Sequence, residues 1–390
     1  MRFLVVAGEA SGDRHGARIL RAIRALRPDA RFWGVGGEAM EGEGLEKLHD
    51  VSALSVMGFV EVVPQLARIV GILRDLARWA ERERPDAAIL LDAPDFNLRL
   101  ARELGHLGIP VFYAIAPMAW AWRESRVRPL RHVEALLCIY PFEEAWFGRR
   151  GVPARFVGNP LLDDPVLADL PPREVCRSAL GLPAAGPILA LLPGSRRAEI
   201  RGVLPPMLEA ARLLFAHDPS LHFVLPVAGD HVAGEIASLV REAPVPVRLL
   251  RGETTRLLRA ADAAIVCSGT ATLQAALALC PQVVAYRAHP VSFFLARRLV
   301  RLSHACIVNI LLGKTAVPEL LQEALVPEAL ARAVLPLLEG APARAAMLRE
   351  YRVLRDELAG PGFGERAAAE ILARLDVSGP ARKATVSHAG

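Results

Sequence analysis

The feature that most constrains the fold is a regular alternation of short apolar runs, rich in valine, isoleucine and leucine, with longer amphipathic stretches. Strands buried on both faces of a parallel sheet have continuous apolar sequences, and the helices that connect them are amphipathic. The pattern therefore predicts an α/β fold of doubly wound parallel sheets. The predicted strands are residues 2–7, 31–35, 87–91, 111–115 and 135–139, followed by 188–192, 222–226, 263–266 and 282–286.

The length of 390 residues fits two α/β domains better than a single core. Aspartates and prolines cluster between Leu161 and Gly186, where the periodicity is lost, so we place the domain boundary there. Two such domains facing each other put the carboxyl ends of their strands on a common cleft, where ligands bind in these folds. The expected organisation is a first domain over 1–165, a linker over 166–186, a second domain over 187–340, C-terminal helices over 341–376 and a disordered tail over 377–390.

The charge balance and the cysteines narrow the function classes. The 47 lysines and arginines exceed the 42 acidic residues only slightly, and they form no dense basic run, so we expect no nucleic-acid partner. The 5 cysteines are scattered, without a CxxC pair or a nearby histidine at zinc-ligand spacing, which indicates reduced core residues and no metal. The chain begins with an apolar strand and not with a signal peptide, so we expect a cytoplasmic protein.

The second half contains a turn suited to a diphosphate. The strand ending at Leu192 turns through Gly194 and Ser195 into a helix, and the amides of that helix start lie beside Arg196. The alternative is an ordinary glycine turn with a solvated arginine.

A second loop of the same type follows the strand 263–266. Its glycine lets the backbone approach a ligand, and its hydroxyls add to the amides of the helix start. A Ser/Thr helix cap explains one hydroxyl but not three. A polar side chain on the first turns of the helix is in place for a ribose hydroxyl. The candidate residues of this loop are Ser268, Gly269, Thr270, Ala271, Thr272 and Gln274.

Two carboxylates end the apolar strand 87–91. Asp95 is most simply the N-cap of the following helix. Asp92 stands where no cap is needed, so it is a candidate general base pointing into the cleft. The structural alternative is a buried carboxylate tied to backbone amides.

The loop Gly8–Asp13 follows the first strand and opens the first helix, so it also faces the predicted cleft. It offers Ser11 and backbone amides to an anionic group. It lacks the GxGxxG dinucleotide pattern, and the glycine-rich segment 34–37 follows the second strand, so the sequence does not favour NAD.

A loop past the strand 111–115 alternates tryptophan with alanine and ends in Arg123. The rings of Trp120 and Trp122 can stack on sugars or acyl chains, and Arg123 can pair with a phosphate. The alternative is that both rings only cover the edge of the sheet.

Two segments favour a membrane surface. Residues 54–76 are strongly apolar, but polar residues and Pro64 exclude a span; a helix packed on the sheet explains one face and leaves surplus apolar side chains. The run Val291–Arg301 is basic and amphipathic, which fits anionic lipid or an ordinary surface helix.

Together, the order and wording of these motifs resemble the lipid-A-disaccharide synthase family from the first strand to Gln322. The resemblance rests on the segments 8–13 (GEASGD), 57–61 (MGFVE), 92–97 (DAPDFN), 120–123 (WAWR), 192–196 (LPGSR), 268–273 (SGTATL) and 318–322 (PELLQ).

The resemblance implies a GT-B architecture of two Rossmann-like domains and an inverting transfer without metal or other cofactor. The implied donor is UDP-2,3-diacylglucosamine and the acceptor is the 6-hydroxyl of 2,3-diacylglucosamine 1-phosphate, at an anionic inner-membrane surface. It adds Asn309 to the UDP site, where Gln274 replaces the glutamate common in relatives. The residues it places on the acceptor side are Glu9, Ser11, Asp13, Met57, Glu61, Asp95, Asn97, Trp122 and Arg123.

Two other function classes remain open on sequence alone. One is another GT-B enzyme of UDP-sugars, such as the UDP-N-acetylglucosamine transferase of peptidoglycan synthesis or a UDP-sugar epimerase. The other is a non-catalytic nucleotide sensor, for which Asp92 would be dispensable. The sequence also leaves the oligomeric state open, with a homodimer as one alternative.

Overall fold

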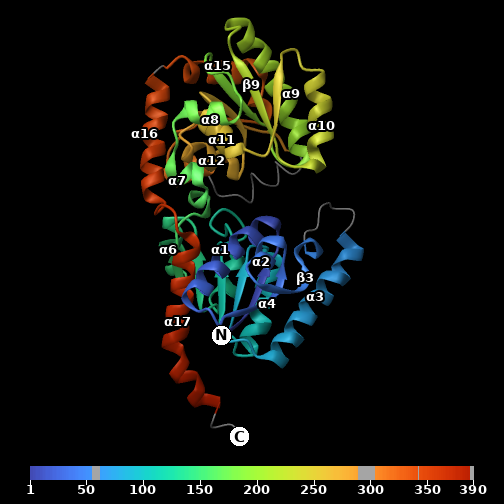
Figure 1. The fold of residues 1–390 in the computed structure, drawn as a ribbon, viewed down its shortest axis with the longest axis vertical. Coiled ribbons are helices and arrows are strands. Elements are labelled where there is room, and N and C mark those ends of the chain that lie inside the picture. Colours follow the sequence, from blue (N-terminus) through green and yellow to red (C-terminus); the bar gives the residue numbers. More distant parts are fainter. Residues whose placement is uncertain (55–61, 289–303, 341, 387–390) are drawn as a thin grey trace. The chain divides into compact units, whose positions relative to one another are not determined.

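The computed structural model describes residues 1–54, 62–288, 304–340 and 342–386. The chain divides into two compact units, one made of Met1–Pro160 with Pro361–Gly390 and the other of Leu161–Gly360. Each unit contains one parallel sheet, of seven strands in the first and six in the second, covered by helices (Figure 1). The predicted α/β class is therefore confirmed.

The first sheet has the order β3-β2-β1-β4-β5-β6-β7. Its direction of winding reverses between β1 and β4, where Ala7 pairs with Leu91, and both strands are almost fully buried because their sequences are apolar. Ligands bind beyond the strand ends at such a reversal point. The strands are β1 (Arg2–Ala7), β2 (Arg31–Gly36), β3 (Leu45–Asp50), β4 (Ala87–Leu91), β5 (Val111–Ala114), β6 (Ala135–Cys138) and β7 (Ala154–Phe156).

Helices cover both faces of this sheet. One core layer joins α1 to the C-terminal helix α17 through Ile19, Ile23, Phe363 and Ile371, and the other joins α3 and α4 to the opposite face. The helices are α1 (Ala10–Leu26), α2 (Glu38–Gly42), α3 (Val62–Glu83), α4 (Pro94–His106), α5 (Val127–Leu130), α6 (Pro141–Gly148) and α17 (Phe363–Val386).

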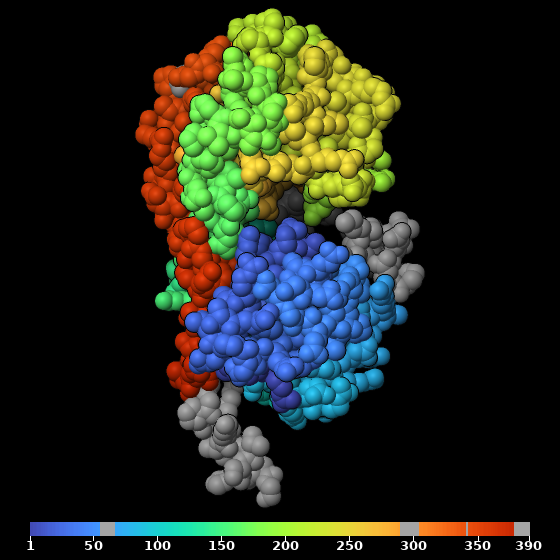
Figure 2. All heavy atoms as spheres, in the orientation of Figure 1, coloured from blue at the N-terminus to red at the C-terminus, as the bar shows by residue number. Residues whose placement is uncertain are grey.

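The helix α17 returns to the first unit, which sequence analysis did not foresee. Figure 2 shows this helix in red against the blue residues of its own unit. Its buried face of Phe363, Ala367 and Ile371 packs on α1. The helix also continues to Val386, through most of the segment predicted as a tail.

The second sheet has the order β10-β9-β8-β11-β12-β13 and reverses between β8 and β11, where Leu192 pairs with Val266. Both predicted phosphate-type turns follow these two strands, so the sequence pattern alone leads to the point where such folds bind ligands. The strands are β8 (Ile188–Leu192), β9 (His222–Val227), β10 (Val247–Arg251), β11 (Ala263–Cys267), β12 (Gln282–Tyr286) and β13 (Glu319–Leu321).

The region predicted as a linker contains two short helices, α7 (Pro165–Asp169) and α8 (Arg173–Ala179). Asp164 caps α7 by accepting a hydrogen bond from the Val166 amide, and Pro165 occupies its first turn. The Asp-Pro pattern therefore starts a helix here. The other helices of the unit are α9 (Arg197–His217), α10 (Asp230–Arg241), α11 (Thr254–Ala260), α12 (Thr270–Leu277), α14 (Ile307–Leu312), α15 (Pro327–Leu338) and α16 (Pro342–Glu357).

Within the described ranges, every helix is too short or too polar to serve as a membrane span. Of the two segments predicted to favour a membrane surface, 291–301 and residues 55–61 of the segment 54–76 lie outside those ranges, as do the candidate residues Met57 and Glu61.

Candidate active site

Asp92 follows β4 directly at the reversal point of the first sheet. Its Oδ1 accepts a hydrogen bond of 3.0 Å from the Gly8 amide, which follows β1. Its Oδ2 is buried and has no hydrogen-bond partner among the described residues. Gly12 leaves the space that Oδ2 fills, since a Cβ there would come within 2.2 Å of it. The glycines of the Gly8–Asp13 loop thus make room for this carboxylate.

The backbone at Asp92 is strained. Asp92 and Ala93 both adopt positive φ, at 49° and 39°, which residues with a Cβ rarely do. Such strain persists only where the surroundings impose it, and it concentrates at functional sites. Here two side chains hold the turn: Tyr113 and Asn97 donate hydrogen bonds to the Asp92 carbonyl, and Asn97 also bonds the Leu91 carbonyl. Asn97, predicted on the acceptor side, therefore has a fully buried, positioning role.

Burial raises the pKa of Asp92 to about 7, and the nearby charge of Glu9 adds to the rise. The hydrogen bond from Gly8 acts in the opposite direction. A carboxylate with a pKa near neutrality is a better proton acceptor than an ordinary aspartate, and an oxygen without a partner has a lone pair to offer.

The residues of the loop after β1 differ in their burial. The carboxylate of Asp13 is buried and accepts hydrogen bonds from the amides of Gly37, Ala39 and Met40, so it holds the start of α2. We assign Asp13 to the scaffold for this reason. Glu9 is exposed and Ser11 half-buried at the start of α1.

Asp95 lies inside the first turn of α4, and Ala93 is the N-cap. The prediction that Asp95 caps the helix is therefore wrong, because the strained turn at Asp92 moves the helix start two residues earlier. Its carboxylate pairs instead with Arg126 at 3.0 Å and with Arg123 at 3.4 Å. Arg126 was missed in the sequence; its only signal was the spacing of three residues from Arg123 in a helix-forming stretch.

The two tryptophans of the next loop differ. Trp122 is exposed beneath the guanidinium groups of Arg123 and Arg126. Trp120 is held: its Nε1 donates a hydrogen bond to Glu143, which is fully buried and also accepts from the amides of Ile139 and Tyr140. Burial raises the pKa of Glu143 to about 7. Sequence reasoning gave Glu143 no role, although it fixes the tryptophan loop.

In the second unit, the turn after β8 is already occupied by a carboxylate. Glu199 accepts hydrogen bonds from the amides of Ser195 and Arg196 at 3.1 and 3.2 Å, and it pairs with the Arg196 guanidinium. Gly194 has a φ of 110°, and a Cβ there would come within 2.5 Å of Glu199. The amides predicted to bind a diphosphate therefore already donate to a carboxylate of the chain itself.

The start of α12 is more open. Gly269 and Thr270 are exposed, and the first amides of a helix have no intrahelical partner. The predicted set of three hydroxyl donors is reduced, because Ser268 donates to the Ala305 carbonyl and Thr272 donates to the Gly269 carbonyl. Gln274 donates to Thr255, which donates to Asp164.

Asn309 has no capacity left for a ligand. Its Nδ2 donates to the Val317 carbonyl and to Glu319, and its Oδ1 accepts from the amides of Ala316 and Val317. These four bonds use the whole amide, which is fully buried. We therefore assign Asn309 to the scaffold of the loop that precedes β13.

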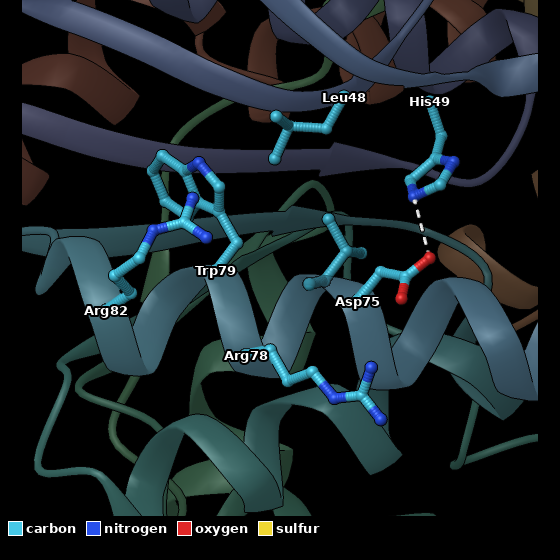
Figure 3. Close-up of a pocket in the computed structure, with 7 residues that line it drawn as sticks. Leu48, His49, Asp75, Arg78, Trp79 and Arg82 are labelled. Carbon is cyan, nitrogen blue, oxygen red and sulfur yellow. Dashed lines mark ion pairs between the residues drawn. The ribbon is translucent and has the colours of Figure 1, made fainter.

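Two hollows lie along α3. One, of about 300 Å³, is lined by residues of β3 and α3, with Leu48 and His49 facing Asp75 and Trp79 (Figure 3). The other, of about 230 Å³, lies between Trp33 and Trp79. Neither contains a candidate residue. In the described part of the chain, no three His, Cys, Asp or Glu side chains are grouped so that they could hold a metal ion.

The two units, each built on a parallel sheet covered by helices, have the GT-B fold. Similar solved structures include the UDP-GlcNAc 2-epimerase from Neisseria meningitidis bound to UDP-GlcNAc, with a TM-score of 0.60 and 13% identity over 96% of this chain and 99% of that one. The calicheamicin glycosyltransferase CalG4 has a TM-score of 0.60 at 17% identity, over 96% and 98% of the two chains. At these identities the likeness establishes the fold alone.

Sequence relatives identify the family within that class. The family model described as lipid-A-disaccharide synthetase matches residues 3–359. The lipid-A-disaccharide synthase of Anaeromyxobacter dehalogenans (strain 2CP-C) is 48% identical over 95% of this chain and 97% of its own length. That of Myxococcus xanthus is 44% identical over 96% and 97%. This chain belongs to the lipid-A-disaccharide synthase family, as its motifs predicted, and the alternatives of an epimerase, a peptidoglycan transferase or a sensor are not favoured.

Proposed function

We propose that the protein transfers 2,3-diacylglucosamine from UDP to the 6-hydroxyl of 2,3-diacylglucosamine 1-phosphate. The observation that carries the proposal is the half-buried carboxylate of Asp92, with one oxygen lacking a partner among the described residues and a pKa raised to about 7. Asp92 takes the proton of the acceptor hydroxyl as that oxygen attacks the anomeric carbon. The bond to the diphosphate breaks, UDP leaves, and the anomeric configuration inverts.

The departing UDP is assigned to the second unit. Breaking the anomeric bond develops negative charge on the diphosphate, and helix-start amides and an arginine stabilise such charge. The groups available are the start of α12 at Gly269 and Thr270 and the turn before α9 with Arg196. Glu199 has to leave the Ser195 and Arg196 amides before a phosphate can take them. Gln274, oriented by Thr255, is assigned to a ribose hydroxyl.

The proposed reaction is tested by supplying both acylated sugars to the purified protein. Equimolar disaccharide 1-phosphate and free UDP are the expected products, detected by mass spectrometry. Hydrolysis of the donor without disaccharide, or UDP binding without turnover, would contradict the proposal.

The acylated substrates also support reversible attachment to the anionic inner face of the membrane, since both carry chains that reside in lipid. The assay is co-sedimentation with vesicles that contain anionic phospholipid, and binding that falls with added salt is the expected result. Light scattering at the enzyme concentration of the activity assay measures whether the working form is a monomer or a homodimer.

A further inference from the structure

Two arginines of the first unit converge on one carboxylate. The Nη2 of Arg126 lies 3.0 and 3.1 Å from the two oxygens of Asp95, and the Nη1 of Arg123 lies 3.4 and 3.5 Å from the same oxygens. Glu124, between the arginines in sequence, accepts a hydrogen bond of 2.9 Å from Arg150. The cluster of Arg123, Arg126 and Asp95 therefore carries a net positive charge.

Arg126 is the largely buried member of this cluster, whereas Arg123 and Asp95 are exposed. Both guanidinium groups lie over the ring of Trp122, at 4.5 Å for Arg123 and 5.2 Å for Arg126. The side chain of Arg126 is 12% exposed, whereas that of Asp95 is 74% exposed. Exposed ion pairs contribute little stability, so replacing Asp95 by a stronger anion costs little. A planar guanidinium held by an aromatic ring is ready to bind a phosphate through two parallel hydrogen bonds.

The cluster lies beside the candidate base. The hydroxyl of Tyr113 donates to the Asp92 carbonyl. Burial raises the pKa of Tyr113 well above its usual value, the charges of Asp92 and Asp95 add to the rise, and the charge of Arg126 opposes it. The candidate base Asp92 and the two arginines thus both follow the ends of the adjacent strands β4 and β5.

We propose that Arg123 and Arg126 bind the phosphate monoester of the acceptor, and that Asp95 holds the site until the acceptor replaces it. The inference rests on the proposed function. On a glucosamine 1-phosphate, the phosphate and the 6-hydroxyl flank the ring oxygen, so an enzyme that fixes the phosphate also places the hydroxyl. The arginine pair therefore selects a phosphorylated acceptor and aligns it for Asp92.

The test compares two acceptors, 2,3-diacylglucosamine 1-phosphate and the same glycolipid without phosphate. The wild-type protein is expected to prefer the phosphorylated acceptor. Arg126→Gln is expected to raise KM for that acceptor about tenfold or more, as loss of a charge-assisted hydrogen bond does, and to remove the preference. The KM for the UDP-sugar should stay unchanged. Arg128→Gln, an exposed arginine two residues further on, is the matched control and should keep the preference.

Asp95→Asn separates a binding role from a structural one. If Asp95 only holds the site, its removal lowers KM for the phosphorylated acceptor, the opposite of Arg126→Gln. If the ion pair only stabilises the fold, both variants weaken the protein and raise KM for both acceptors alike, which overturns the inference. Unchanged discrimination in Arg126→Gln also overturns it and leaves the proposed function standing. A wild-type protein that forms no disaccharide from either acceptor overturns both.

Discussion

Asp92 and Asn309 are two polar side chains that sequence reasoning placed in the active site, and their surroundings differ completely. The Asn309 amide makes four hydrogen bonds, to groups of the loop that follows α14 and to Glu319 at the start of β13. The Asp92 carboxylate accepts one, and its second oxygen has no partner in the described part of the chain although it is buried. Burying a polar atom without a partner costs free energy, so a fold keeps one only where something else is gained. The difference separates a site residue from a scaffold residue more sharply than either motif does.

Glu199, in the first turn of α9, lies between these extremes. Glu199 satisfies the helix-start amides of Ser195 and Arg196 as a scaffold residue would. However, the groups that it satisfies are those expected to bind a diphosphate, and the hydrogen bonds are exposed. If UDP binds there as proposed, Glu199 is a replaceable occupant of the UDP site, and its removal should affect binding and stability in opposite directions.

The largest effect is expected for Asp92→Asn. An amide cannot accept the acceptor proton, so turnover should fall by about 10³-fold, within the range found for general bases. The variant should remain folded, because the amide fits the same space without the cost of a buried charge. Disaccharide formation and thermal melting are measured together. Turnover within a factor of two of wild type removes Asp92 from the mechanism.

Asn309→Ala should have the opposite effects, a loss of stability without a change in substrate binding. The amides of Ala316 and Val317 would lose their acceptor, so the protein should lose about 3 kcal/mol of stability. The KM for the UDP-sugar should be unchanged in the fraction that remains folded. Melting followed by circular dichroism measures the loss of stability. Kinetics are then measured about 15 °C below the melting temperature of the variant, where it is folded. A variant of normal stability with weakened donor binding would return Asn309 to the UDP site.

The interior of each sheet was predictable from sequence, and its edges were not. The nine predicted strands all exist, and the four that were missed are β3, β7, β10 and β13, the edge strands of the two sheets. Strands buried on both faces have to be apolar throughout, so their sequences stand out. Edge strands such as β3 (LEKLHD) and β10 (VRLLR) are partly solvated and carry charges. Their sequences therefore resemble those of surface loops.

The same physics limited the prediction of the site. Asp92 and the turns at Gly194 and Gly269 could be predicted as site candidates because each follows an apolar strand, and strand ends at a reversal point bind ligands. Arg126, Glu143 and Glu199 were missed because their roles depend on tertiary contacts. Glu143 reaches Trp120 from the first turn of α6, a separation of 23 residues that no local pattern encodes. The hydrogen bonds of Asp13 and Asn309 could not be predicted either, because a motif does not reveal which partners a side chain already has.

The pH dependence of stability sharpens the contrast further. The folded-state pKa of Asp92 is about 7, above the ordinary value of 3.8. The folded protein therefore binds this proton more tightly than the unfolded chain, and the contribution to stability is present at low pH and is lost as pH rises through 7. Between pH 4 and 7, this group should lower the free energy of unfolding by about 1.4 kcal/mol for each unit of rising pH. Glu143 is present in both proteins, so the difference between wild type and Asp92→Asn, measured by urea unfolding from pH 5 to 8, isolates Asp92. Parallel curves for the two proteins would contradict the raised pKa.

The smallest effect is expected for Glu199→Ala. Whether UDP binds more tightly or more weakly to this variant tells which role the carboxylate has. Without the carboxylate, UDP no longer has to displace an internal anion from the Ser195 and Arg196 amides, so its dissociation constant should fall about fivefold, equivalent to about 1 kcal/mol. The melting temperature should fall at the same time, because the helix start loses its cap. Titration calorimetry with UDP gives the affinity, and Glu209→Ala, on the same helix with an exposed pair to Arg212, is the matched control. Weaker UDP binding in Glu199→Ala would mean that the carboxylate orients Arg196 for the diphosphate, which places Glu199 with Asn309 among the scaffold residues.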